Sequence, residues 1–166
     1  MKLLGSVQFI ANSTRPDILF AVNKLAAYTA NLGLQHHSTL KQILRYLAGT
    51  KTLGITYQRS QDDTENENLF HRYADAAYMN TNDHKSMTGY VFILAGGAIM
   101  WKSKQQTIIA LSSTESEYVA LGEAGHEATW LRNLYAELGF PQGLPTIIWG
   151  DNKGSVTLTH NPQFHQ

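Results

Sequence analysis

The stretch Leu111-Ser112-Ser113-Thr114-Glu115-Ser116-Glu117-Tyr118 decides the fold of this 166-residue chain. It predicts the end of a strand, a helix cap and the first turn of a long helix. From Glu117, spacings of four and three residues keep a stripe on one helical face, apolar at every later position. The stripe is Glu117, Leu121, Ala124, Ala128, Leu131, Tyr135 and Leu138. A carboxylate heading a core-facing stripe is costly unless a cation or proton meets it, so we expect Glu117 to bind a metal ion.

Two capping boxes are possible at the start of this helix. Ser112 could pair with Glu115, or Thr114 with Glu117. Helical periodicity favours the first pair, because Glu117 shares the apolar stripe whereas Glu115 lies two residues, about 200°, away from it. We therefore expect Glu115 to cap the helix and Glu117 to face the interior.

Composition predicts a globular protein with one main core. Hydrophobic residues make up 43% of the chain and charged residues 16%, values typical of globular domains, and 166 residues can bury one core with a smaller appendage. No apolar run has the length of a membrane span and the N-terminus has no signal core, so we expect neither a membrane partner nor secretion. The absence of cysteine excludes a disulfide framework and a thiolate metal site.

Charge divides the chain into two regions. Residues 1–60 carry seven Lys and Arg against one acid, whereas residues 61–166 carry six against twelve. Unless it is an accident of a short chain, this asymmetry indicates one region suited to a polyanion and one that gathers carboxylates. Residues 61–68 belong to a run without apolar side chains, and we interpret them as a linker between regions 1–60 and 69–166.

Local patterns predict the order of helices and strands. Before the linker we expect helices over 14–33 and 38–48 and a strand over 54–58. After it we expect strands over 69–78, 88–94, 99–104 and 107–111, the long helix, a strand over 146–149, and a last helix that begins at 151 or 152. Gly139 is the expected stop of the long helix. Trp101, Trp130 and Trp149 are expected to pack in the core or the hairpin.

Three acids occupy distinctive positions in this order. Asp75 lies late in a strand, Glu117 in the first turn of the long helix, and Asp151 at the end of the next strand. Because connections in α/β domains return right-handed, all three are expected near one sheet edge. Such carboxylates suit Mg²⁺ or Mn²⁺, and two ions about 4 Å apart would clamp the attacking water and leaving oxygen of phosphodiester hydrolysis. Alternatively, Asp75 faces solvent and Asp151 only caps the last helix.

Five ordered motifs carry a resemblance to a known family. They are Tyr73-Ala74-Asp75-Ala76, the segments 83–91, 96–105 and 110–121, and Gly150-Asp151-Asn152. Together they resemble the ribonuclease H domain of copia-type LTR retrotransposon Pol polyproteins over essentially all of residues 69–166. Residues 1–60, with motifs at 11–18 and 43–50, resemble the C-terminal end of the reverse transcriptase region that precedes this domain.

The resemblance implies a ribonuclease H-like α/β fold, a mixed sheet with flanking helices behind a small, mainly helical segment. It makes Asp75, Glu117 and Asp151 the metal-binding catalytic acids, and the pattern Glu-Tyr-x-Ala selects Glu117 over Glu115. The implied reaction is Mg²⁺- or Mn²⁺-dependent endonucleolytic hydrolysis, with two ions, of the RNA strand of an RNA–DNA hybrid recognised by shape and 2′-hydroxyls. The implied partners are the hybrid and the reverse transcriptase and integrase regions of the polyprotein. The implied location is intracellular, in cytoplasmic virus-like particles and the nucleus.

Two departures from the family pattern leave other functions open. Many relatives have Asp-Ala-Asp-Trp where this chain has Asp75-Ala76-Ala77-Tyr78. The family's fourth metal-site aspartate and its terminal helix are expected beyond Gln166. The second hypothesis is therefore a catalytically inactive domain that supports hybrid binding or assembly. A third, drawn from the acids alone, is an unrelated metal-dependent phosphatase or phosphotransferase.

Overall fold

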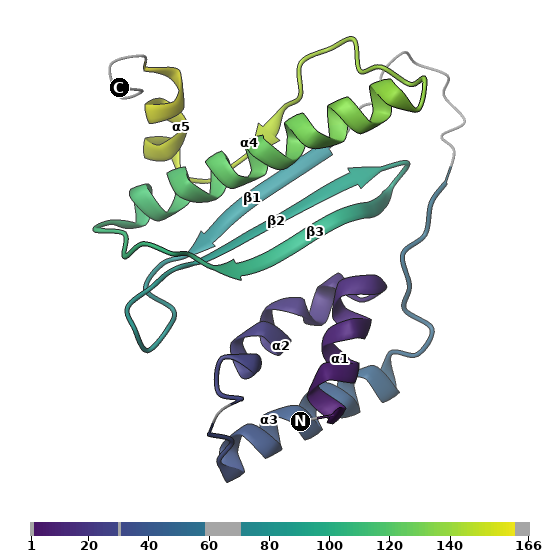
Figure 1. Cartoon of the computed structure of the whole chain (residues 1–166), viewed down its shortest axis with the longest axis vertical. Coiled ribbons are helices and arrows are strands. Elements are labelled where there is room, and N and C mark those ends of the chain that lie inside the picture. Colours follow the sequence, from purple (N-terminus) through teal and green to yellow (C-terminus); the bar gives the residue numbers. More distant parts are fainter. Residues whose placement is uncertain (1, 30, 59–70, 162–166) are drawn as a thin grey trace.

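A four-stranded mixed sheet forms the centre of the C-terminal region (Figure 1). The computed structural model describes residues 2–29, 31–58 and 71–161. Strands β1 (His71–Ala77), β2 (Met87–Leu94), β3 (Gly97–Gln105) and β4 (Ile148–Trp149) lie in the order β3-β2-β1-β4. β2 is antiparallel to β1 and β3, and β4 is parallel to β1. The predicted mixed sheet with flanking helices is confirmed, and it is consistent with a ribonuclease H-like fold.

The long helix α4 (Ser113–Glu137) covers one face of this sheet (Figure 1). Its predicted apolar stripe packs on the sheet over most of its length, and the shared core contains Ala74, Tyr90, Phe92, Ala124, Ala128 and Leu131. The last stripe position was predicted wrongly, because α4 ends at Glu137 and Leu138 is 60% exposed. Beyond it, Gly139 has a φ of +87°, and the N–H of Phe140 bonds back to the carbonyl of Tyr135 at 2.8 Å. Glycine adopts this left-handed conformation without strain, which confirms the predicted stop.

At the start of α4, Ser112 is the cap with Glu115 as its partner, as predicted, but the Glu115 carboxylate bonds one residue earlier than a capping box requires. The Ser112 hydroxyl accepts a hydrogen bond from the Glu115 N–H at 3.1 Å, and the Glu115 carboxylate accepts one from the Leu111 N–H at 2.7 Å. These bonds satisfy donors that a helix N-terminus leaves free. Glu117 takes no part in the cap. It lies on the buried face of α4 and is 7% exposed.

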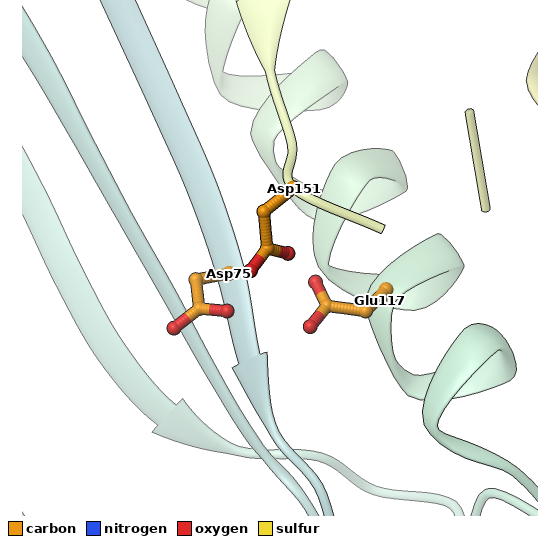
Figure 2. Close-up of side chains that lie close together, drawn as sticks. All are labelled: Asp75, Glu117 and Asp151. Atoms are coloured by element: carbon orange, nitrogen blue, oxygen red, sulfur yellow. The ribbon is translucent and has the colours of Figure 1, made fainter. Parts of the chain in front are cut away.

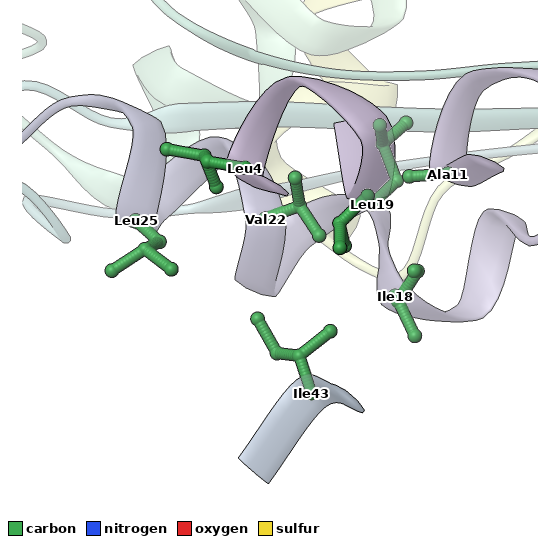
Figure 3. Close-up of a cluster of buried hydrophobic side chains, with 8 residues drawn as sticks. Leu4, Ala11, Ile18, Leu19, Val22, Leu25 and Ile43 are labelled. Carbon is green, nitrogen blue, oxygen red and sulfur yellow. The ribbon is translucent and has the colours of Figure 1, made fainter. Parts of the chain in front are cut away.

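Four helical elements form the N-terminal region: α1 (Lys2–Ser13), the 3-10 turn η1 (Pro16–Ile18), α2 (Leu19–Ala26) and α3 (Leu34–Gly49). Their core consists of Leu4, Val7, Ala11, Ile18, Leu19, Val22, Leu25 and Ile43, most of which Figure 3 labels. The single helix predicted over 14–33 is instead η1 followed by α2, and α1 was not foreseen. The second predicted helix, α3, begins before Ser38, because the N–H of Gly33 donates to the His36 ring at 3.0 Å and starts the helix there.

Two predicted strands are absent from the described residues. Residues 54–58 are irregular, and the Gln58 N–H bonds to the Ala95 carbonyl at 2.9 Å without forming a ladder. Residues 107–111 are also irregular, because Gln106 turns into the interior and no described strand pairs with the chain beyond it, which is exposed except at buried Ala110. The predicted linker 61–68 and the first two residues of the strand predicted over 69–78 lie outside the described residues. Within these same residues, no helix is both long and apolar enough to span a membrane.

The helical region packs against the sheet face opposite α4 (Figure 1). The indole N–H of Trp101 donates to the Ala11 carbonyl at 2.9 Å, and the Asn23 amide donates to the Ser103 carbonyl at 2.6 Å. Trp101 therefore packs as predicted. Trp130 and Trp149 do not, since they are 52% and 54% exposed.

Replacing Trp101 by phenylalanine tests this packing. The variant keeps the apolar ring and removes the donor for Ala11, so we expect a loss of about 1 kcal/mol of stability. At this chain length that lowers the melting temperature by about 2–4 °C. The same substitution at exposed Trp130, where no such bond is described, is the control, and equal effects of the two changes would contradict the packing role.

Candidate metal centre

Three carboxylates converge where β1, β4 and α4 meet (Figure 2). Asp75, Glu117 and Asp151 each offer a carboxylate oxygen, and these three atoms lie within 4.8 Å of one another. Asp75 and Asp151 are exposed, whereas Glu117 is buried. The structure thus brings together all three acids selected from the sequence, with one ligand anchored in the interior and two facing solvent.

The end of β4 creates the space for the cluster. β4 pairs with β1 only at Arg72 and Tyr73, so the β1 edge beyond Tyr73 is free of its neighbour. There the backbone amide of Ala76 lies near the Glu117 carboxylate and favours its charged form. The Glu117 carboxylate therefore lies beside a part of the β1 edge that β4 does not cover, close to Asp75.

Asp151 follows β4 directly and enters the cluster from the strand end. A Cβ added to Gly150 would lie 3.3 Å from Leu121 Cδ2, so the glycine lets the chain pass close to α4 at this point. The N-cap of α5 (Lys153–His160) is Asn152, whose side chain accepts from the Ser155 N–H at 3.0 Å. The alternative that Asp151 only caps the last helix is therefore wrong, and its carboxylate is free for the cluster.

Burial and like charge shape the electrostatics of the site. Burial, together with the nearby charges of Asp75 and Asp151, raises the pKa of Glu117 from its ordinary value of 4.5 to about 7, although the Ala76 amide works in the opposite direction. Within the part of the chain that the structure describes, the ion pairs are Arg15–Asp17 and Lys102–Glu127. No basic side chain described here therefore neutralises the cluster.

This donor set fits a divalent cation such as Mg²⁺ or Mn²⁺. All three donors are carboxylate oxygens, the ligands that these ions prefer. Oxygens bound to Mg²⁺ lie at about 2.1 Å from it, so three donors within 4.8 Å of one another are close to the spacing that a shared ion requires. A cation there would offset the mutual repulsion of the acids.

Replacing Glu117 by glutamine is expected to stabilise the protein when divalent ions are removed with EDTA. The folded-state pKa of Glu117 lies above its unfolded value, so wild-type stability is lost as the pH rises from about 4.5 through about 7. Glutamine carries no charge and avoids this loss. At pH 8 we expect a melting temperature higher by at least about 2–4 °C, the change that 1 kcal/mol produces at this chain length.

The pH dependence identifies the cause of this stabilisation. The gap between Glu117→Gln and the wild type should shrink as the pH falls towards 5, whereas Glu137→Gln, at the exposed end of α4, should show no comparable gap. A Glu117→Gln protein that is less stable than the wild type at pH 8 in EDTA would contradict the electrostatic account.

One residue behind the site was missed from the sequence. Gln106 is 1% exposed, and its amide donates to the Thr88 hydroxyl at 3.1 Å and to the Ser116 carbonyl at 2.9 Å. It thereby ties the first turn of α4, next to Glu117, to β2. A lone glutamine after a strand carries no periodic or spacing signal, so the pattern could not distinguish it from a surface residue.

Comparison with curated proteins finds polyproteins of transposons. The chain is 38% identical over 164 residues to the Retrovirus-related Pol polyprotein from transposon RE2 of Arabidopsis thaliana, covering 98% of this chain and 11% of that protein. It is 37% identical over 163 residues to the Retrovirus-related Pol polyprotein from transposon TNT 1-94 of Nicotiana tabacum, covering 98% and 12%. The chain thus spans about a tenth of the length of these relatives.

A shorter relative matches over most of its own length. Secreted RxLR effector protein 161 of Plasmopara viticola is 37% identical over 132 residues, which cover 79% of this chain and 89% of that protein. No family model and no solved structure matches the chain.

Proposed function

Because this chain belongs to the same family as a segment of the retrovirus-related Pol polyproteins of transposons, we propose that it is a metal-dependent nuclease that cleaves the RNA strand of RNA–DNA hybrids. The cofactor in this proposal is Mg²⁺ or Mn²⁺, with two ions. The proposed partners are the hybrid and the reverse transcriptase and integrase regions of a larger polyprotein.

The observation that supports the proposal is the convergence of Asp75, Glu117 and Asp151 from three separate elements. An oxygen-only set of three acids suits the ions used in phosphoryl chemistry, and two of the acids face solvent, where a phosphodiester can approach. Asp151 is available to the cluster because Asn152, not Asp151, caps the last helix.

The acids have distinct roles in the proposed reaction. Buried Glu117 is the anchored ligand, and exposed Asp75 and Asp151 are ligands that also border the path of the substrate. When bound, the metal ions would supply an activated water and stabilise the leaving oxygen. A bound cation would also favour the charged form of Glu117, whose pKa is otherwise raised.

A cleavage assay on the full chain tests this function. An RNA–DNA hybrid labelled on the RNA strand is incubated with Mg²⁺, Mn²⁺ or EDTA, with duplex DNA, duplex RNA and a small phosphomonoester as parallel substrates. We expect internal cuts in the RNA strand of the hybrid with either metal, and none in EDTA.

Each other result has a definite meaning. Hybrid binding without cleavage, even at high Mn²⁺, would replace the nuclease by the non-catalytic binding role. Turnover of the phosphomonoester with no action on the hybrid would favour a phosphatase. Cleavage that persists in EDTA would remove the metal from the proposal.

A further inference from the structure

A hollow of about 580 Å³, lined by both polar and apolar side chains, separates the helical region from the loop between β1 and β2. On one side it is lined by α2 and the residues that follow it, and on the other by the loop residues that connect Ala77 to Met87. Its lining includes Asn23, Lys24, Tyr28, Asn80, Asn82 and Asp83. Neither the acid cluster nor the cores of the two regions explain why amide side chains gather here around two lysines, Lys24 and Lys104.

The loop wall of the hollow is held in one conformation by its own hydrogen bonds. The Thr81 hydroxyl accepts from the Lys85 N–H at 3.0 Å, and the Thr81 N–H donates to the Lys85 carbonyl at 3.2 Å. The Gln105 amide adds bonds from β3 to Thr81 at 3.1 Å and to Asp83 at 3.2 Å. The polar side chains of this wall are therefore presented by a preorganised loop, which lowers the entropic cost of binding.

The other wall of the hollow, formed by α2, is also held in place by hydrogen bonds. The Asn23 amide bonds to the Ser103 carbonyl on β3, and the Lys24 ammonium donates to the Asn80 side-chain oxygen across the hollow (Figure 1 shows α2 beside this loop). An ammonium has three donors, so two remain for a ligand. Lys24 is exposed, and it lies 5.9 Å from the centre of the Phe20 ring, one helical turn earlier.

A second hollow continues the first towards the acid cluster. It has a volume of about 380 Å³, shares Met87 and Ser103 with the first hollow, and is lined by Asp75. Its lining includes Gly89, which pairs with Asp75 across β1 and β2. Because glycine has no side chain, it does not obstruct this hollow. Phe20 and Tyr73, which are 41% and 50% exposed, border it with aromatic surface. The two hollows adjoin at Met87 and Ser103, and we call the surface that they line, from Asp75 to Lys24, the channel.

We propose that this channel receives the sugar–phosphate backbone of the nucleic-acid substrate, with Lys24 bound to a phosphate and Phe20 against a sugar or base. The inference rests on the proposed nuclease function and adds that the helical region is part of the substrate-binding surface. A polyanion fits the channel because the basic side chains that line it, Lys24, Lys102 and Lys104, outnumber the acids Asp75 and Asp83. Aromatic surface beside a cation is the combination with which proteins hold nucleic-acid strands without sequence preference.

Salt-dependent binding tests the channel separately from catalysis. A fluorescently labelled RNA–DNA hybrid is titrated with the full chain in Ca²⁺, and gels of the same samples check for cleavage. Removal of one phosphate contact reduces the slope of log affinity against log salt by about 1, so we expect this change in Lys24→Ala and in Lys24→Gln, which keeps a donor for Asn80. Phe20→Ala should lose affinity about fivefold or more at an unchanged slope.

Lys41→Ala is the matched control, because Lys41 is an exposed lysine of α3 that lines neither hollow. If both Lys24 variants have the same slope of log affinity against log salt as the wild type, the proposed binding channel is wrong, even if the wild type cleaves hybrids. Absence of hybrid binding by the wild type would also overturn it. A slope change limited to the Lys24 variants, in a protein that cleaves nothing, would retain the channel and remove the nuclease.

Discussion

Replacing Asp75 by asparagine is expected to abolish most metal-dependent cleavage of RNA–DNA hybrids. Changes to residues that only support metal ligands cost about 10- to 100-fold in metal affinity or activity, so loss of a ligand should cost at least about 100-fold. Asparagine has nearly the same shape as aspartate but carries no charge, and Asp75 is exposed, so folding should be little affected. The cleavage rate under saturating hybrid measures the effect directly.

A second measurement separates loss of metal binding from other causes. Any ligand that binds only the folded state raises its melting temperature, so Mg²⁺ should stabilise the wild type and stabilise Asp75→Asn much less. Asp151→Asn should behave like Asp75→Asn, because both acids belong to one cluster. Glu137→Gln, which removes an exposed carboxylate at the far end of α4, is the control. Cleavage at the wild-type rate in Asp75→Asn would exclude that acid from the reaction.

The acid cluster could be predicted from the sequence because its members stand at ends of strong patterns. Glu117 heads an apolar stripe, Asp75 lies late in a strand-forming segment, and Asp151 follows the next such segment. The structure confirms that the three acids converge. The apolar periodicity of the helix and strands determines which of their faces pack together, and this leaves few other positions for the acids. The helix boundary at Ser112 was predictable for the same reason, because a cap and a periodic stripe agreed.

The irregular parts could not be predicted because their conformation depends on distant partners. Residues 107–111 have strand-like composition, yet Gln106 turns inward to bind β2 and α4, and none of the described strands lies beside them. Trp149 was expected in the core, but β4 lies at the edge of the described sheet and leaves the indole 54% exposed. In both cases tertiary contacts overrode local propensity.

Replacing Gln106 by leucine is expected to have the largest effect on stability among the changes considered for residues outside the acid cluster. The substitution keeps the approximate volume of the side chain and removes the donor to Thr88 Oγ1 and to the Ser116 carbonyl. Thr88 and Ser116 are fully buried, and a buried polar group that loses its partner costs about 1–3 kcal/mol. We expect a loss of about 2 kcal/mol, which lowers the melting temperature by about 4–8 °C.

The same change should also weaken the metal site. Ser116 precedes Glu117, so its anchored carbonyl holds the first turn of α4 against β2. Without this anchor, we expect a smaller increase in melting temperature on addition of Mg²⁺ than in the wild type. Gln35→Leu, at an exposed position of α3, is the control for the change of residue type.

A double-mutant cycle with Thr88→Val shows whether the buried hydrogen bond itself causes these effects. Valine removes the hydroxyl that Gln106→Leu would leave unpaired, so the double variant should be more stable than the sum of the two single changes implies. Contacting residues of one hydrogen-bond network couple by about 0.5–3 kcal/mol. Strict additivity would mean that the bond to Thr88 contributes nothing and that the loss comes from the bond to the Ser116 carbonyl. A clear coupling, together with a reduced response to Mg²⁺ in Gln106→Leu, would make this glutamine the link that holds the helix start, and with it Glu117, to the sheet.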